Sequence, residues 1–169
     1  MQLFVTVGST QFPELTTRFE DSEFVLYLRR AGFSHVVIQY GTAPRPTPPS
    51  DIRFELFDFE EDLSSWIAGA DLVIAHAGAG TILEVAQLGV RMVAVVNVAL
   101  MDDHQRELVD ALPFVVCCEV CDLETAVDEA LSRKPSNEAA KMMETAERSL
   151  ELLKDMLFGS LKTDIFERV

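Results

Sequence analysis

Residues 72–88 constrain the fold of this chain more than any other stretch. Residues 72–75 form a short apolar run that is typical of a buried strand, and a Gly-Ala-Gly turn follows at residues 78–80. Residues 81–88 then show the apolar spacing of a helix. A strand that passes through a glycine turn into a helix directs unpaired backbone N–H groups and the positive end of the helix dipole at one point. Such a point favours a bound anion, and phosphate groups above all.

The residues of this turn are open to more than one interpretation. Gly78 and Gly80 lack a Cβ atom, so we expect the backbone to turn tightly and a ligand to approach it there. Thr81 is able to cap the helix or to donate its hydroxyl to a phosphate oxygen. Glu84 either closes a capping box with Thr81 or accepts hydrogen bonds from a sugar diol. Leu83 stands where the dinucleotide-binding fingerprint requires a small residue, which ranks a nicotinamide-dependent oxidoreductase last.

Apolar runs alternate with helical patterns along the rest of the chain. We expect strands at residues 3–7, 35–40, 52–59, 72–75, 91–96 and 114–118. Helices are expected at residues 13–30 with a break near 21–22, and at 63–70, 81–88, 101–112, 123–132 and 135–157. This alternation predicts an α/β fold with a doubly wound, mostly parallel, Rossmann-like sheet. We assign residues 1–133 to that domain, and residues 134–169 to a C-terminal helix and tail that pack on it or dock a partner.

Small and polar residues follow the first and the fifth expected strands. Gly8, Ser9 and Thr10 end the first strand, and His104 and Gln105 open the helix after the fifth. Because the carboxyl ends of parallel strands share one edge of a sheet, we expect all five residues at the edge that carries the Gly-Ala-Gly turn. The first three, with Ala79 of that turn, are candidate phosphate contacts, although a plain strand-to-helix turn has the same composition.

The histidines near this edge also allow two interpretations. His104 and Gln105 either reach the hydroxyls of a bound sugar or lie at a solvated helix N-terminus that Asp102 and Asp103 cap. The two aspartates are also able to hold a divalent cation on a diphosphate, although adjacent carboxylates on an opening turn more often cap the helix. His76 is either a packed histidine at a strand end or a phosphate neighbour whose charge depends on pH.

Charge and hydropathy exclude several classes of protein. The 169 residues carry a formal net charge of −14, which argues against binding to nucleic acid or directly to an anionic membrane surface. No apolar run approaches the roughly 18 residues that span a bilayer. The N-terminus enters a strand without a basic segment or a cleavage site. We therefore expect a cytoplasmic protein without a membrane span.

The three cysteines lie close together in the sequence. Cys118 and Cys121 have the C-x-x-C spacing of redox and zinc sites, and Cys117 precedes them. Structural zinc requires four ligands, and no second pair of cysteines occurs. The spacing also follows an apolar run instead of opening the first strand-to-helix turn. We interpret the cysteines as ordinary reduced thiols at the end of a strand.

Familiar catalytic motifs are missing from the sequence. It contains no Ser-His-Asp arrangement, no Walker lysine motif, no zinc motif and no convincing pair of carboxylates for glycoside hydrolysis. The predicted edge therefore favours binding of a phosphorylated, hydroxyl-bearing ligand, without an acid–base pair of its own.

Three motifs occur together in this chain. They are residues 4–10 (Phe-Val-Thr-Val-Gly-Ser-Thr), residues 76–81 (His-Ala-Gly-Ala-Gly-Thr) with Glu84, and residues 100–105 (Leu-Met-Asp-Asp-His-Gln) with Glu107 and Leu108. In this order and spacing they resemble the catalytic-subunit family of the eukaryotic UDP-N-acetylglucosamine transferases of dolichol-linked oligosaccharide synthesis. The resemblance covers nearly the whole chain. That family is similar to the donor-binding C-terminal half of two-domain GT-B glycosyltransferases of the family 28 type.

The resemblance implies one half of a split, inverting glycosyltransferase. Such an enzyme moves GlcNAc from UDP-GlcNAc to dolichol-diphosphate-GlcNAc, the second step in assembling the lipid-linked oligosaccharide for N-glycosylation. A separate membrane-anchored subunit would hold the acceptor and recruit this chain to the cytosolic face of the endoplasmic reticulum. No metal or cofactor is expected.

The resemblance also implies roles for individual residues. Residues 8–10 and 78–81 would surround the diphosphate, Glu84 would bind the ribose hydroxyls, and His104 and Gln105 would address the GlcNAc. The catalytic residue stays unassigned, with His104 and Glu84 the best candidates for a role critical to transfer. The general base is expected from the partner or the acceptor.

Two departures and two alternatives accompany this interpretation. The first loop contains Gly-Ser-Thr where the family usually has Gly-Thr-Thr, and the proline-rich residues 44–49 replace a basic, glycine-containing loop. A bacterial-type split transferase of exopolysaccharide synthesis, with another UDP-sugar as donor, would share the same turn and Glu84. A non-catalytic module that binds a UDP-sugar is the second alternative.

Overall fold

The computed structural model of the protein describes residues 1–8, 10–97 and 115–133. The helices expected at residues 101–112 and 135–157, and the C-terminal unit 134–169, lie outside the described residues. Within the described part of the chain, no helix combines the length and the apolar character that crossing a membrane requires.

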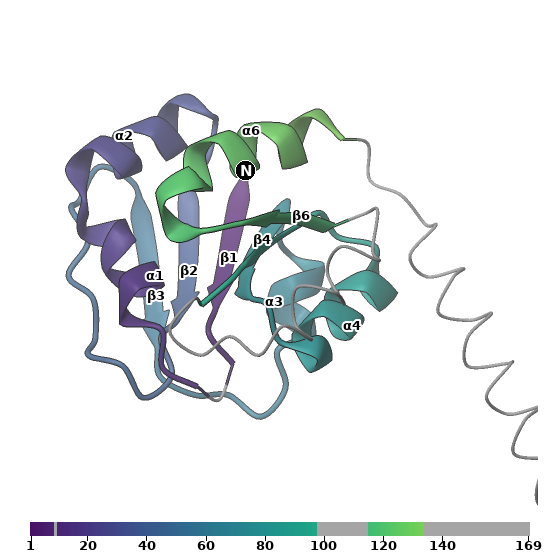
Figure 1. The fold of residues 1–169 in the computed structure, drawn as a ribbon. Coiled ribbons are helices and arrows are strands. Elements are labelled where there is room, and N and C mark those ends of the chain that lie inside the picture. Colours follow the sequence, from purple (N-terminus) through teal and green to yellow (C-terminus); the bar gives the residue numbers. More distant parts are fainter. Residues whose placement is uncertain (9, 98–114, 134–169) are drawn as a thin grey trace, which may run out of the picture.

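The described strands form a single parallel sheet. Its strands are β1 (Gln2–Thr6), β2 (His35–Gln39), β3 (Arg53–Phe57), β4 (Leu72–His76), β5 (Met92–Val95) and β6 (Val115–Cys118), in the order β3-β2-β1-β4-β5-β6 (Figure 1). Every neighbouring pair is parallel. This is the strand order of the doubly wound Rossmann-like fold, so the predicted fold class is confirmed. The observed ends differ from the expected ones by one or two residues, as strand ends commonly do.

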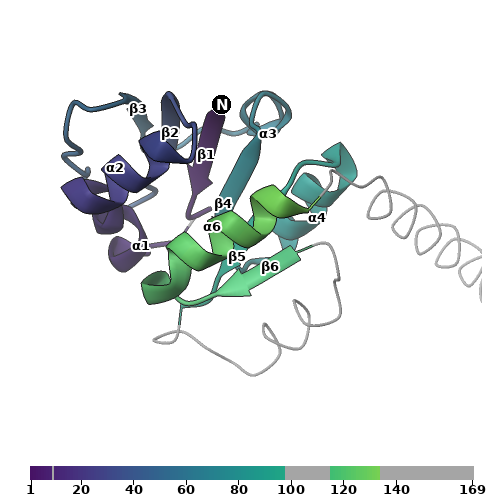
Figure 2. The same cartoon turned by 90° about the horizontal axis from the view of Figure 1, so that it is seen from above.

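Helices cover both faces of the sheet. They are α1 (Pro13–Thr17), η1 (Arg18–Glu20), α2 (Ser22–Arg30), α3 (Ser64–Ala68), α4 (Ala79–Leu88), η2 (Val120–Asp122) and α6 (Leu123–Ser132). Figure 2 shows α1, α2 and α6 on one side of the sheet and α3 and α4 on the other. The predicted break in the first helical segment is confirmed at Asp21, whose carboxylate caps α2 by accepting from the backbone N–H of Glu23 at 2.9 Å.

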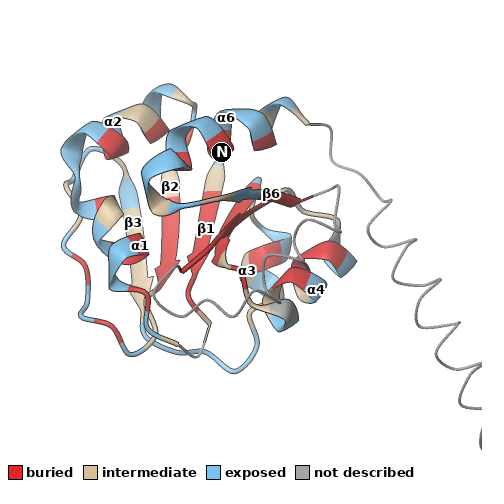
Figure 3. Ribbon diagram, viewed as in Figure 1, coloured by how far each residue is buried: buried red, intermediate tan, exposed pale blue. Residues whose placement is uncertain are grey.

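Two apolar cores form because both faces of the sheet are covered. Leu3 and Val5 of β1 belong to the core under α1, α2 and α6, whereas Phe4 between them belongs to the core under α3 and α4. Successive side chains of a strand point to opposite faces, so a strand buried on both sides must be apolar at every position. Figure 3 shows β1 and β2 buried along most of their length, and β4 and β5 are buried in the same way, whereas the edge strand β3 is only partly buried. The prediction that Trp66 and Ile67 face the sheet is confirmed, since both pack in the second core.

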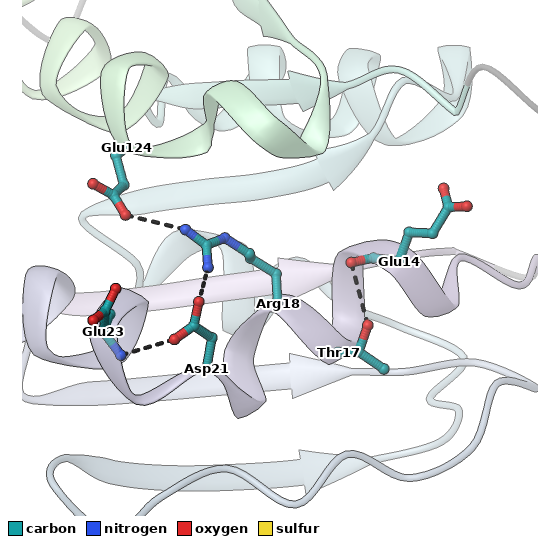
Figure 4. A network of polar contacts seen from close by, with 6 residues as sticks. All are labelled: Glu14, Thr17, Arg18, Asp21, Glu23 and Glu124. Atoms are coloured by element: carbon teal, nitrogen blue, oxygen red, sulfur yellow. Dashed lines mark hydrogen bonds and ion pairs between the residues drawn. The ribbon is translucent and has the colours of Figure 1, made fainter.

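A polar cluster joins the beginning of the chain to α6. The Arg18 guanidinium contacts the carboxylate of Asp21 and lies 3.1 Å from that of Glu124 (Figure 4). It also lies over the Phe24 ring, 4.6 Å from the ring centre. The Tyr27 hydroxyl donates to the Glu124 carbonyl at 2.8 Å. Burial raises the pKa of Tyr27, and a hydrogen bond to a neighbouring carboxylate raises it further. The hydroxyl of Tyr27 therefore stays protonated at neutral pH. We call these residues the α2–α6 clasp.

The three cysteines of the described residues are thiols, as predicted. Cys117 and Cys118 end β6, and Cys121 lies in the following turn. Burial raises the pKa of the Cys118 thiol to about 12, and partial desolvation with the nearby Asp122 carboxylate raises that of Cys121. Raised thiol pKa values disfavour the reactive thiolate. No group of three or more metal-ligating side chains occurs in the described part of the chain.

We expect the α2–α6 clasp to make a small, salt-dependent contribution to the free energy of unfolding. Replacing Arg18 by Met keeps an apolar stem against Phe24 but removes the charge, and we expect the free energy of unfolding to fall by about 1 kcal/mol. Denaturant unfolding at low and high NaCl measures the effect, which must shrink with added salt. The matched control is Arg30→Met, because Arg30 has no ion pair among the described residues. Equal losses in the two variants would contradict this role of Arg18.

Candidate functional site

The carboxyl ends of β1 and β4 lie side by side at the point where the strand order reverses. Thr6, the last residue of β1, is in register with Ala75 of β4. The chain leaves β1 toward helices on one face and leaves β4 toward a helix on the other (Figures 1 and 2). Open parallel sheets bind their ligands at this switch point. The sequence placed its first two candidate turns, after residues 3–7 and 72–75, at this edge, and the structure brings them together.

The turn after β4 presents the N-terminus of α4. Gly78 is the N-cap residue, and its own N–H donates to the His76 carbonyl at 2.6 Å. The first hydrogen bond of the helix runs from the N–H of Ile82 to the carbonyl of Gly78 at 3.1 Å. The amides of residues 79–81 therefore have no acceptor within the helix. Three donors and the positive end of the helix dipole are directed at the switch point.

The helix begins two residues earlier than predicted, which changes the role of Thr81. The sequence left Thr81 as either the helix cap or a hydroxyl donor to phosphate. The first alternative does not hold, because α4 begins at Ala79 and Gly78 is the N-cap, without a side-chain cap. The predicted capping box is therefore wrong. Glu84 instead accepts a hydrogen bond from the hydroxyl of Ser64 in α3 at 3.3 Å. Its half-buried carboxylate is held near the mouth of α4 by a neighbouring helix and not by its own.

The two glycines of the turn are not required by the backbone. Gly78 has φ −83° and ψ 131°, a conformation open to any residue, and a Cβ atom there would meet the His76 ring at an ordinary 3.5 Å. Gly80 is also absent from the residues with positive φ, and a Cβ atom there would have nothing within 4 Å. The chain turns here as expected, but neither position needs glycine for its backbone conformation. Gly80 leaves open space beside the unpaired amides.

His76 is packed at the end of β4. The edge of its ring meets Phe12, with ring centres 6.0 Å apart and planes at 85°. Its Nε2 atom is buried and has no hydrogen-bond partner among the described residues. Burial lowers the pKa of His76, so the ring is neutral at pH 7 in the ligand-free protein. This agrees with a packed strand-end histidine and means that the ring brings no positive charge to an anion at that pH.

The turn after β1 is held from below by buried polar side chains. Gly8 adopts φ 65°, and its N–H donates to the Oγ1 atom of Thr6 at 3.0 Å. Its carbonyl accepts from the side-chain amide of Gln39 at 2.8 Å. The hydroxyl of Thr10 donates to the Val7 carbonyl at 2.9 Å. Both backbone groups of Gly8 are therefore used within the protein, a result that the sequence did not predict.

Three of the predicted site residues, Ser9, His104 and Gln105, lie outside the described residues. Conversely, Thr6 and Gln39 support the site but were not singled out by their sequence. Thr6 stands inside an apolar strand and Gln39 at the end of another, which are ordinary places for such residues. Only the register that pairs Thr6 with Gln39 across β1 and β2 shows that they meet.

The arrangement is suited to holding a phosphorylated ligand with a hydroxyl-bearing group. The amides at the start of α4 are donors for an anion. Glu84 is an acceptor one helical turn further on, where hydroxyls of the same ligand would lie. His76 and Glu84 are the titratable side chains of the described turn and helix at this edge.

The chain is similar in sequence to known proteins. Residues 2–156 match the model of the glycosyltransferase family 28 C-terminal domain. A relative from Cryptococcus neoformans, UDP-N-acetylglucosamine transferase subunit ALG13, is 32% identical over 193 aligned positions, which cover 93% of this chain and 96% of the relative. The mouse subunit of the same name is 39% identical over 64% of this chain, and that match spans 10% of the mouse protein.

A solved structure agrees in fold over most of the chain. The solution structure of an ALG13 protein superposes with a TM-score of 0.61 and 26% sequence identity, covering 85% of this chain and 94% of that one.

Gly80→Ala tests whether Gly80 keeps open the space beside the amides of α4 and is not needed for folding. Alanine is the better helix former, so we expect the free energy of unfolding to rise by about 0.5 kcal/mol. Gly89→Ala, at the other end of the same helix, is the matched control. Gly89 has φ 68°, so alanine there must destabilise by about 1 kcal/mol. Denaturant unfolding measures both, and a destabilised Gly80→Ala would show that the fold itself requires this glycine.

The lowered pKa of His76 predicts a specific pH dependence. The folded protein keeps this ring neutral, whereas the unfolded chain protonates it near pH 6.5. The contribution of His76 to stability is therefore complete above pH 6.5 and is lost as the pH falls through the lower folded pKa. NMR titration of the ring must give a midpoint below 6.5, and His76→Gln must lose less stability on acidification than the wild type. A midpoint at or above 6.5 would refute the burial argument.

Proposed function

Because this chain belongs to the glycosyltransferase family 28 C-terminal domain family, we propose that it is the donor-binding, catalytic subunit of a two-subunit glycosyltransferase. In this proposal the enzyme moves GlcNAc from UDP-GlcNAc to dolichol-diphosphate-GlcNAc, in the assembly of the lipid-linked oligosaccharide for N-glycosylation. Relatives that carry the name of a UDP-N-acetylglucosamine transferase subunit support the choice of donor. The observation that carries the proposal is the open N-terminus of α4 at the switch point.

The diphosphate of the donor is assigned to the start of α4. The amides of residues 79–81 are donors without an acceptor in the helix, and Gly80 leaves the space beside them open. A diphosphate needs compensation of its charge, and this acidic chain supplies it here through backbone dipoles. Gly8 would shape the opposite wall together with Thr10, whose hydroxyl donates to the Val7 carbonyl.

Glu84 is assigned to the ribose of the nucleotide. A carboxylate accepts from two neighbouring hydroxyls at once, which suits a sugar diol. The hydroxyl of Ser64 already donates to one of its oxygens at 3.3 Å and so restricts the rotation of the side chain. The position one turn beyond the diphosphate site fits the distance between phosphates and ribose in a nucleoside diphosphate.

The transfer is proposed as an inverting displacement without a metal ion. The acceptor hydroxyl oxygen forms a bond to the anomeric carbon of GlcNAc, the bond from that carbon to the diphosphate breaks, and UDP leaves with both electrons. The N-terminus of α4 stabilises the charge that develops on the leaving diphosphate. His104 and Gln105 are proposed to contact the GlcNAc. The hydroxyl proton goes to a base that the partner or the acceptor supplies.

A membrane-anchored partner is proposed to bind the lipid acceptor at the cytosolic face of the endoplasmic reticulum. The word subunit in the names of the relatives supports a partner, and so does a family described as a C-terminal domain. No helix in the described part of the chain is fit to span a bilayer. A dolichol-linked acceptor would therefore be presented by the other subunit.

Glu84→Gln separates the proposed enzyme from a non-catalytic module. Loss of a charged acceptor that binds a hydroxyl costs about 1.5–3 kcal/mol, so we expect the Kd for UDP-GlcNAc to rise at least tenfold. Calorimetric titration of the full chain measures this, and transfer with the membrane partner present must fall in parallel. Glu23→Gln on α2 is the matched control, because only the backbone N–H of Glu23 takes part in a described hydrogen bond.

The same titration, repeated with UDP-glucose and UDP-glucuronate, tests the choice of donor. Tighter binding of another UDP-sugar would favour a transferase of exopolysaccharide synthesis. Binding of UDP-GlcNAc without transfer in the presence of the partner would favour a non-catalytic module. An unchanged Kd in Glu84→Gln would exclude the ribose assignment.

A further inference from the structure

Two polar side chains lie buried under the turn after β1. Thr6 is 0% exposed and Gln39 is 2% exposed, and they belong to the four buried polar residues among the described ones. At this depth neither side chain is able to touch a ligand. A buried polar group is costly unless its hydrogen bonds are made, so their partners show what they hold in place.

The hydrogen bonds of both side chains lead to Gly8. The Thr6 hydroxyl donates to the Oε1 atom of Gln39 and accepts from the N–H of Gly8 at 3.0 Å. The Nε2 atom of Gln39 donates to the carbonyl of Gly8 at 2.8 Å. The two side chains and the two backbone groups of one glycine thus form a closed ring of hydrogen bonds. Hydrogen bonds to its N–H and to its carbonyl together hold Gly8 at φ 65°.

The same network reaches the ends of the next two strands. The carbonyl of Asp58, just after β3, accepts from Nε2 of Gln39 at 3.1 Å and from the N–H of Gly41 at 3.1 Å. A Cβ atom on Gly41 would lie 2.5 Å from the carbonyl oxygen of Thr10, so only glycine fits against the β1 turn. The ends of β1, β2 and β3 are therefore locked together directly beneath Gly8 and Thr10.

We propose that Thr6 and Gln39 are positioning residues for the diphosphate of the donor. They act through Gly8 and Thr10, whose backbone they fix at the switch point opposite the N-terminus of α4. The inference rests on the proposed function, because it concerns the same donor site. Fixing one wall of the site before the ligand arrives removes an ordering cost from binding. The inward-turned N–H of Gly8 also means that Gly8 shapes this wall and leaves the hydrogen bonding of phosphate to other donors.

A pair of substitutions at Thr6 separates positioning from packing. Thr6→Val keeps the shape of the side chain but removes the hydroxyl. The N–H of Gly8 and the side-chain Oε1 atom of Gln39 then lose their partner. Thr6→Ser keeps the hydroxyl but removes a buried methyl group. A purely structural role predicts that binding follows stability. A positioning role predicts that Thr6→Ser binds as the wild type does and Thr6→Val does not, whichever is the more stable.

The experiment measures two properties of the full chain. Hydrogen exchange at the Gly8 amide, followed by NMR, reports the network without a ligand, and calorimetry with UDP and UDP-GlcNAc reports the donor site. Val36→Ala, in the core of β2 at its far end, is the matched control for lost stability. We expect the Gly8 amide to be protected in the wild type and in Thr6→Ser and to exchange at least tenfold faster in Thr6→Val.

For the donor we expect a Kd at least tenfold higher in Thr6→Val and within twofold of the wild type in Thr6→Ser and Val36→Ala. If Thr6→Val does not fold, Gln39→Met replaces it. This variant removes the hydrogen bond to the Gly8 carbonyl, and we expect the same rise in Kd. An unprotected Gly8 amide in the wild type, or equal Kd values in Thr6→Val and Thr6→Ser, overturns the positioning role. A wild type that binds neither UDP nor UDP-GlcNAc, with the Gly8 amide protected, overturns the donor-site assignment instead.

Discussion

The structure depends on a parallel sheet that is buried on both faces. Each central strand has to supply apolar side chains in both directions, as Leu3, Phe4 and Val5 do, and helices have to cover both sides. Polar groups are thereby excluded from the middle of these central strands and gather where the strands end. The carboxyl edge at β1 and β4 has a further property, because there the helices depart to opposite faces. The position of the candidate site therefore follows from the way in which helices cover the two faces of the sheet.

Most of the fold was predictable because the apolar patterns are local. The run at residues 72–75 and the helical spacing at 123–132 have the same meaning in any context, and α6 occupies the predicted residues. The start of α4 was not predictable in this way. Thr81 has the side chain that an N-cap prefers, but the strand ends so close to it that Gly78 takes the position with an extended backbone. The start of α4 is therefore set by the path of the chain out of the sheet and not by the capping preference of Thr81.

The candidate site was predictable only in part, for a related reason. The Gly-Ala-Gly turn and the residues after the first strand are recognisable one segment at a time, and the parallel sheet brings them to one edge. The partners of Thr6 and Glu84 come from other segments, Gln39 and Ser64. The role of Thr6 cannot be recognised in the sequence, because only the strand register shows that the side-chain amide of Gln39 lies beside it. Support for a site is non-local even where its contact residues are local.

The α2–α6 clasp has a consequence for how the chain folds during its synthesis. Arg18 and Glu124 are 106 positions apart, and Tyr27 donates to a carbonyl 97 positions further on. The first third of the chain therefore leaves the ribosome long before the helix that covers its face exists. Until α6 is made, the apolar side chains beneath it are open to water and to other chains, and pairings this distant in sequence form slowly. A chaperone that covers this face on the growing chain would meet a need that the topology itself creates.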